Sequence, residues 1–159
     1  MRIVAGILCC CVPSVTSAST ATTTFPVTAT VLGVCSVSAS SLDFGNYDPT
    51  SVTDLDASTT LDVLCTIGTS FTVGLSAGTA PGATVTTRAM TNGGNTLDYE
   101  LYQDAGRTTN WGNTPGADTP ASAIAGLTAT SYTVYGRIAQ GQNVAAGSYS
   151  DTITVTVNY

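Results

Sequence analysis

The chain ends with the stretch Tyr149-Ser-Asp-Thr-Ile153-Thr-Val155-Thr-Val157-Asn-Tyr159, in which apolar and polar residues alternate almost without interruption. Alternation by two puts one kind of residue on each face of a β-strand. Thr, Val, Ile and Tyr are also the residues that strands favour. We therefore expect a half-buried strand that runs to the final residue and leaves no residues after it for a further strand.

The same alternation recurs along the chain, whereas a helical period is nearly absent. Gly, Asn, Asp and Pro separate the alternating runs, and Asn92-Gly-Gly-Asn95 is a strong hairpin signal. The predicted strands before the last one are 25–31, 61–67, 71–77, 97–101 and 132–138. Residues 104–129 lack a pattern and are expected to form a long loop with at most one short strand. These features predict an all-β sandwich of two sheets.

The N-terminus has the order of a secretory signal peptide. Arg2 is followed by the apolar run 3–12 and then by the small residues Thr16-Ser-Ala18. We predict a signal peptide at residues 1–18, because the apolar run is shorter than the roughly 20 residues that span a bilayer. Three adjacent cysteines at 9–11 make a lipoprotein signal the alternative, although none follows a small residue in the usual lipobox pattern.

Removal of the signal leaves two of the five cysteines, Cys35 and Cys65. Two cysteines in an exported chain most simply form one disulfide. Closing a loop of this length should stabilise the fold by about 3–4 kcal/mol on the chain-entropy model. A metal pair and a free thiol nucleophile are the alternatives, and the absence of histidine from the sequence disfavours both.

The mature chain is acidic but carries few charges. Three arginines remain against ten acidic residues, which gives a net charge of −7 before the termini are counted. Such a chain repels nucleic acid and anionic lipid. Only 9% of residues are charged, compared with about 25% in average domains. Low charge leaves strand edges poorly protected against pairing with other chains, which suits a polymer better than a monomer.

The composition argues against catalysis. Because the sequence has neither His nor Lys, Ser-His-Asp, Cys-His, zinc and Schiff-base chemistries lack a required residue. No glycine-rich phosphate loop precedes a predicted helix. We expect no enzymatic activity, no cofactor and no small-molecule substrate.

Four other groups of residues could form a site, although a structural role explains each one more simply. Four acidic residues could form a calcium site, or could simply be carboxylates scattered in turns. They are Asp48, Asp54, Asp56 and Asp62. Asp98 and Glu100 alternate along one strand and would face the same side. They could form an acid pair of the glycosidase type, or lie on a solvated face of the strand. Asp104 and Arg107 flank a turn and could pair locally. Five aromatic residues could form a platform on which a sugar stacks, or could be ordinary core and edge residues of a sandwich. They are Trp111, Tyr99, Tyr102, Tyr132 and Tyr135.

Several stretches in a fixed order carry a resemblance that covers the mature chain. They are Thr28-Ala-Thr-Val31, Cys35-Ser-Val37, Leu42-Asp-Phe44-Gly45-Asn-Tyr47, Val63-Leu-Cys65, Phe71-Thr-Val-Gly-Leu75, Leu97 to Thr108, Val134-Tyr-Gly136-Arg-Ile138 and Ala146 to Tyr159. No single stretch is diagnostic, but together they resemble the spore coat protein U domain family, which includes major subunits of archaic (Csu-type) chaperone–usher pili.

The resemblance implies an incomplete Ig-like β-sandwich, one strand short, at residues 33–159, preceded by a donor-strand extension at 19–32. It places a disulfide between Cys35 and Cys65. It implies an acceptor groove edge at Ile153, Val155 and Val157. The donor residues it implies are Phe25, Val27, Ala29 and Val31. Pro26 departs from an ideal donor because it removes one backbone hydrogen bond.

The resemblance also implies a function and partners. A periplasmic chaperone lends a strand to the groove, and an outer-membrane usher exchanges that strand for the extension of the next subunit. The product is a linear homopolymer at the cell surface, a pilus used for attachment and biofilm formation. The alternatives are a secreted monomeric carbohydrate- or surface-binding module and a structural protein of a spore or cell coat.

Overall fold

The computed structural model describes residues 17–159, so most of the predicted signal peptide lies outside the described residues. The chain divides into two units, one ending at Thr30 and one spanning Val31–Tyr159. Residues 17–30 are exposed and contain neither helix nor strand. No helix among the described residues has the length and apolar character needed to cross a membrane.

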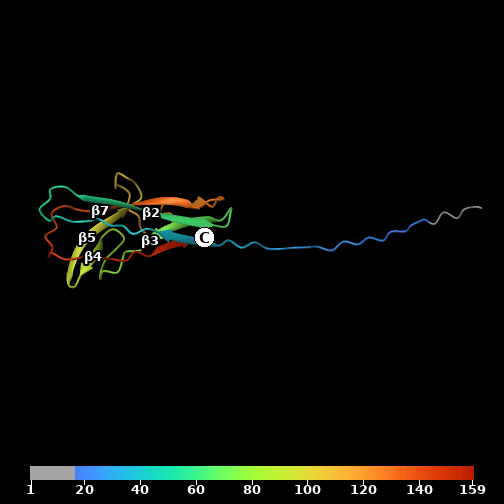
Figure 1. The fold of residues 1–159 in the computed structure, drawn as a ribbon, viewed down its shortest axis with the longest axis horizontal. Helices are drawn as coiled ribbons and strands as arrows, with labels where there is room; N and C mark the ends of the chain where they lie inside the picture. Colours follow the sequence, from blue (N-terminus) through green and yellow to red (C-terminus); the bar gives the residue numbers. More distant parts are fainter. Residues whose placement is uncertain (1–16) are drawn as a thin grey trace, which may run out of the picture. The chain divides into compact units, whose positions relative to one another are not determined.

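The second unit, hereafter the domain, is built from eight strands (Figure 1). They are β1 (Cys35–Ala39), β2 (Leu55–Cys65), β3 (Ser70–Leu75), β4 (Arg88–Asn92), β5 (Asn95–Tyr102), β6 (Ala123–Ile124), β7 (Thr130–Ile138) and β8 (Val155–Asn158). One sheet has the order β1-β2-β7-β5-β4 and the other has the order β6-β3-β8. All strand pairs are antiparallel. The predicted all-β sandwich is therefore confirmed.

The core lies between the two sheets and follows the alternation of the sequence. In β2 the inward residues Leu61 and Val63 are 1% exposed, while their neighbours are more open. On the opposing sheet Phe71, Val73 and Leu75 are equally buried. Burial of such side chains contributes about 1.5–3 kcal/mol each, so these two strands hold the sandwich together.

A buried tryptophan and a buried arginine fix the long loop after β5. The indole of Trp111 donates a hydrogen bond to the Val73 carbonyl at 2.9 Å. The fully buried guanidinium of Arg88 donates to the carbonyls of Leu75, Ser76, Val85 and Trp111. Because a buried charge needs such partners, Arg88 ties β4 to β3 and to the loop.

The segment after β1 packs across β7 at a glycine. A Cβ on Gly136 would lie 2.7 Å from the ring of Phe44 and 2.8 Å from the Leu42 side chain. Only glycine therefore lets Leu42 and Phe44 approach the β7 backbone this closely. Both side chains remain partly exposed and pack against the core, and they lead directly to the candidate site.

Several strand bounds differ from those predicted. β4 and the first half of β2 were not predicted, and residues 25–31 form no strand among the described residues. The last strand begins at Val155, later than the alternation indicates, since Ile153 lies outside it. The patternless region 104–129 contains one short strand, β6, as expected.

Candidate strand-acceptor cleft

The edge strand β1 has inward-facing side chains that nothing in the domain covers. Its inward positions are set by the register with β2, in which Cys35, Val37 and Ala39 oppose the buried residues Cys65, Val63 and Leu61. Directly opposed residues point to the same face of a sheet. Even so, Val37 is 39% exposed and Ala39 is also exposed. The core is thus open along β1.

The edge strand β8 of the other sheet is open in the same way. Val155 and Val157 oppose the buried residues Leu75 and Val73 of β3, so they also face inward. Both are only half-buried, as is Ile153 just before the strand. Two inward-facing edges, one from each sheet, therefore border uncovered apolar surface.

The backbone along these edges is also available for pairing. In an antiparallel ladder, alternate residues direct their N–H and C=O groups toward the partner strand, and the residues between them direct these groups away. Ser76 N–H donates to the Thr154 carbonyl at 3.0 Å, so Thr154 and Thr156 face β3. The backbone groups of Ile153, Val155 and Val157 consequently point to the free edge.

The same reasoning applies to β1. Ser40 N–H donates to the Thr60 carbonyl at 3.0 Å, and Thr66 N–H donates to the Val34 carbonyl at 2.9 Å. The residues between Val34 and Ser40 that face away from β2 are the odd-numbered ones, including Val37. On both edges, therefore, the residues that point their side chains into the core also present free backbone groups.

A cleft of about 400 Å³ lies at the ends of these edges, with Ala39 of β1 and Val155 of β8 among its lining residues. Its walls come from the segment 39–44 after β1 and from the segment 149–155 that leads into β8. Its floor is formed by core side chains of both sheets, namely Leu61, Leu75, Met90, Tyr99, Leu101 and Val134. Most of the lining is apolar, as a cleft for a partly apolar strand requires.

A second hollow of about 510 Å³ continues from the first. The two share Leu42, Phe44, Met90 and Tyr149 as lining residues. The second hollow extends the cleft between the segments 42–49 and 144–149. The cleft is therefore elongated, which suits an extended peptide better than a compact small molecule.

One charged group lines the first hollow. The Asp151 carboxylate accepts hydrogen bonds from Tyr99 Oη at 2.7 Å and from Thr79 N–H at 2.7 Å. Burial raises the pKa of Asp151, but the hydrogen bonds from Thr79, Tyr99 and Thr152 lower it by more. The pKa of Asp151 therefore lies below its usual value. Burial first, and then the bond to Asp151, raise the pKa of the Tyr99 hydroxyl. The carboxylate is thus held in place rather than offered to a ligand.

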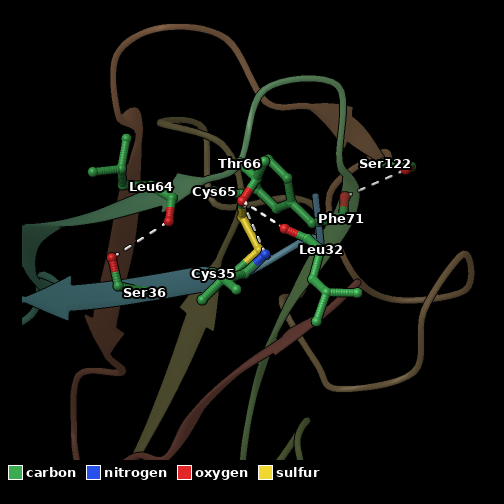
Figure 2. Close-up of a disulfide and its surroundings, with 9 residues drawn as sticks. Leu32, Cys35, Ser36, Leu64, Cys65, Thr66, Phe71 and Ser122 are labelled. Carbon is green, nitrogen blue, oxygen red and sulfur yellow. Dashed lines mark hydrogen bonds between the residues drawn. A yellow bond between two sulfur atoms is a disulfide. The ribbon is translucent and has the colours of Figure 1, made fainter. Parts of the chain in front are cut away.

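A disulfide between Cys35 and Cys65 fastens β1 to β2 at the end of the domain where the chain enters (Figure 2). The Thr66 side chain supports the entering segment, since its Oγ1 accepts from Val34 N–H at 3.1 Å and donates to the Leu32 carbonyl at 3.2 Å. Edge strand β1, which has only one partner strand, is therefore held in position by a covalent bond.

The predicted site residues fall into two groups. Of the predicted groove-edge residues, Ile153 and Val155 line the cleft and Val157 lies further along β8, and their role as acceptors stays a prediction. The predicted donors Phe25, Val27, Ala29 and Val31 are exposed. No contact of the donor segment with another chain is present, so the donor assignment stays a prediction.

The cleft floor was missed by the sequence analysis. The sequence also predicts no role for the wall residues Leu42 and Phe44, although their spacing by two indicates one shared face. Tyr99 was considered only as an aromatic platform. No pattern within one strand could have identified the floor, because its residues come from five strands of both sheets.

Two of the weaker acidic candidates serve structural roles. Asp56 binds Arg137 at 2.8 Å and Arg107 at 3.2 Å, and the hydrogen bond from Arg137 lowers its pKa. Asp104 accepts from the backbone of Thr109 at 2.7 Å and does not form an ion pair with Arg107. No group of three or more potential metal ligands occurs among residues 17–159.

The other weaker candidates do not form a site as proposed. Glu100 accepts a hydrogen bond from the Tyr102 hydroxyl, and burial first and then this bond raise the pKa of Tyr102 to about 12. Trp111 is 1% exposed and Tyr99 is 5% exposed. A sugar-stacking platform that includes Trp111 is therefore wrong, because the Trp111 ring is enclosed in the core, and Tyr99 belongs to the cleft floor instead.

Comparisons with known proteins agree with this architecture. The chain is 37% identical over 157 residues to Protein U from Myxococcus xanthus, and the match covers 89% of this chain and 87% of that protein. A solved structure with the same fold is the rod subunit PapA of the P pilus, with a TM-score of 0.50, 16% identity and coverage of 79% of this chain and 98% of PapA.

A second solved structure is the chaperone–tip adhesion subunit pre-assembly complex CsuC–CsuE from archaic chaperone–usher Csu pili of Acinetobacter baumannii. It matches with a TM-score of 0.58 and 26% identity, over 82% of this chain but only 41% of the matched chain. The family model of the Spore Coat Protein U domain matches residues 21–156. With an open pilin-like sandwich and a match across most of its length, this chain belongs to the Spore Coat Protein U domain family, a structural rather than an enzymatic family.

Proposed function

We propose that this protein is a structural subunit that polymerises by donor-strand exchange, in which the extension 19–32 of one copy supplies a strand, ending at Val31, to the cleft of the next. The observation that carries the proposal is the pair of open edges. Strands β1 and β8 both present inward-facing side chains and free backbone groups, and the apolar cleft opens where β1 ends at Ala39 and β8 begins at Val155. An added strand would cover the exposed core and complete both ladders at once.

The donor segment fits this cleft in its chemistry. Phe25 and Val27 are 80% and 84% exposed, and they alternate with polar residues, so one face of the extended segment is apolar. Each large side chain that becomes buried contributes about 1.5–3 kcal/mol. Each backbone hydrogen bond adds about 0.5–1.5 kcal/mol net. Several of each would make a joint that opens slowly.

The proposed partners follow from the open cleft and from the relatives. The CsuE structure contains a chaperone bound to a subunit before assembly. We infer that a periplasmic chaperone protects the cleft of this chain, and that an outer-membrane usher replaces the chaperone strand with the next donor. Export by the signal peptide, passage through the periplasm and assembly at the cell surface, with a role in attachment and biofilm formation, complete this proposal.

The central experiment deletes the donor. We expect the mature wild-type chain to give a ladder of oligomers on unboiled detergent gels, which collapses on heating. The chain without residues 19–30 should still fold with its chaperone but should give no ladder. A control appends a second copy of residues 19–31 to the C-terminus through a flexible linker. This self-complemented chain should be monomeric, because its own donor occupies the cleft.

Two results would contradict the proposal. Normal polymerisation of the deleted chain would exclude residues 19–30 as the donor. A wild-type chain that stays monomeric at high concentration and binds a glycan saturably would favour a secreted binding module instead. A coat polymer outside a pilus uses the same joint, and the family name and the match to Protein U support it. Electron microscopy of the native cell surface distinguishes a coat from a fibre.

A further inference from the structure

The end of the domain that carries the disulfide has a large exposed apolar surface. Its residues, hereafter the disulfide-end patch, are Leu32, Val34, Leu64, Ile67, Ile124, Leu127 and Tyr159, which are all exposed. Ile67 and Leu127 are 64% and 86% exposed. Figure 2 shows Leu32 and Leu64 on different sides of the disulfide, so the patch extends around this end.

Hydrogen bonds hold the patch together around one turn, residues 66–69. Thr66 binds the backbone of Leu32 and Val34. Gly68 N–H donates to the Ala125 carbonyl at 2.9 Å, which brings the turn beside the loop that carries Leu127. These bonds join segments that are far apart in the sequence, so the patch is a built feature of the fold.

The segments that supply the patch contain no charged side chain, although Asp62 lies two residues from Leu64 on the same face of β2. The segments 31–42, 63–87, 119–136 and 152–159 contain no Asp, Glu, Lys or Arg, and they supply all the residues of the patch. Groups of exposed large apolar side chains often mark sites of interaction with other proteins. Two copies that each carry a net charge of −7 repel one another. The repulsion is weakest where the two surfaces in contact carry no charged side chains.

Building on the proposed function, we infer that the disulfide-end patch is a second contact with a copy of this chain, namely the copy whose cleft holds the donor. The chain length supports this occupant. The donor reaches Val31, while Leu32 is already bound to Thr66 through its carbonyl. Since consecutive Cα atoms are about 3.8 Å apart, no linker remains between the two. The copy that holds the donor must therefore lie directly against the patch.

The contact has a mechanical consequence. A joint that consisted of the donor strand alone would let neighbouring subunits pivot around Val31. Burial of Ile67 and Leu127 against the neighbour would restrict that motion. The patch is therefore expected to set the angle and stiffness between successive subunits, while the donor strand supplies the strength of the joint.

Hydroxyl-radical footprinting of the wild-type fibre tests the contact directly, with the self-complemented monomer as the reference. Oxidation of Ile67 and Leu127 should be several-fold slower in the fibre. Tyr135, which lies on the outward face of β7, should react equally in both. Equal oxidation of Ile67 and Leu127 in fibre and monomer would overturn this inference, even where the heat-sensitive ladder forms as the proposed function requires.

Variants give a second readout. Ile67→Asp and Leu127→Asp change exposed side chains, so the subunit should fold and the ladder should persist, but the persistence length of the fibre in electron micrographs should fall several-fold. Ser58→Asp is the matched control on the exposed outward face of β2 and should leave the fibre unchanged. Unaltered stiffness in both patch variants would also contradict the inference, whereas loss of the ladder in the wild type would refute the proposed function and the inference together.

Discussion

At the level of single residues, the Asp151 carboxylate links the cleft wall to its floor. It accepts hydrogen bonds from Thr79 on one side and from the buried Tyr99 hydroxyl on the other. Removal of a partner from a buried hydroxyl costs about 1–3 kcal/mol. Asp151 is therefore expected to stabilise the cleft shape rather than to contact a ligand.

The lowered pKa of Asp151 makes this contribution depend on pH. A carboxyl whose pKa is lower in the folded state stabilises the fold above its unfolded value of about 4, and the stabilisation is lost as the pH falls through the folded pKa. We expect Asp151→Asn to lower the free energy of unfolding of the self-complemented chain at pH 7 but to change it little at pH 2. Urea titration followed by Trp111 fluorescence measures both values. An equal loss at both pH values would contradict the assignment.

A second residue-level prediction concerns Gly136. An added methyl group would collide with Phe44 and Leu42, so Gly136→Ala should destabilise the self-complemented chain by about 1–3 kcal/mol through overpacking. Gly94→Ala is the control, since a Cβ there meets no atom within 4 Å. A shift of the urea midpoint in the first variant alone is expected. Equal midpoints for both variants would show that Phe44 is not fixed against β7.

At the level of strands, the register of β8 separates two kinds of backbone hydrogen bond. Val155 directs its N–H to the free edge, whereas Thr156 directs its N–H to Gly74 of β3. Proline removes the N–H. Val155→Pro should therefore weaken the fibre, seen as a lower temperature at which the ladder collapses, beyond the effect of Val155→Ala. In the proposed function the chaperone strand pairs with the same edge, so Val155→Pro should weaken the chaperone-bound subunit as well, beyond the effect of Val155→Ala.

The control for this prediction is Thr156→Pro, which breaks a bond inside the subunit and should destabilise the chaperone-bound subunit itself. The prediction fails if the oligomer ladders of Val155→Pro and Val155→Ala collapse at the same temperature. That result would show that the β8 edge gains no backbone partner in the fibre.

The strands also show how far sequence reasoning reaches. β3 and β7 could be predicted because their inward residues are apolar and alternate with polar ones. β4 could not, because its inward residue Arg88 is charged and is buried only through carbonyls supplied by distant segments. Alternation and the resemblance predict an acceptor edge on β8, and this assignment stays a prediction. The cleft floor could not be predicted, since its residues come from five strands of both sheets.

At the level of the whole molecule, charge and apolar surface are separated. A charged cluster lies away from the disulfide end: Asp56 of β2 pairs with Arg137 of β7 and with Arg107 of the loop after β5. Surface pairs of this kind contribute little to stability. Asp62 is closer to the disulfide. The apolar surface is concentrated in the cleft and at the disulfide-end patch. The molecule thus has two apolar surfaces at which copies can associate, and the rest of its surface is acidic and repels other copies.

This separation predicts opposite effects of salt on the rate of assembly and on the durability of the fibre. Copies with a net charge of −7 repel one another on approach, and salt screens the repulsion, since the Debye length falls from about 30 Å at 0.01 M to about 10 Å at 0.1 M. We expect ladder formation from chaperone-bound subunits to accelerate over this range. The assembled joint should resist high salt, because it is made of apolar side chains and backbone hydrogen bonds, and excluded salts such as sulfate strengthen apolar burial.

Time courses of ladder formation at the two salt concentrations measure the first effect. Incubation of finished fibres in concentrated salt, followed by unboiled gels, measures the second. A version of the chain with three acidic residues neutralised, the exposed Asp48→Asn and Asp98→Asn and the half-buried Asp62→Asn, should assemble faster at low salt and lose most of the salt dependence. Dissolution of finished fibres by salt would contradict the apolar joint, because it would mean that ion pairs between copies, rather than a shared sheet, hold them together.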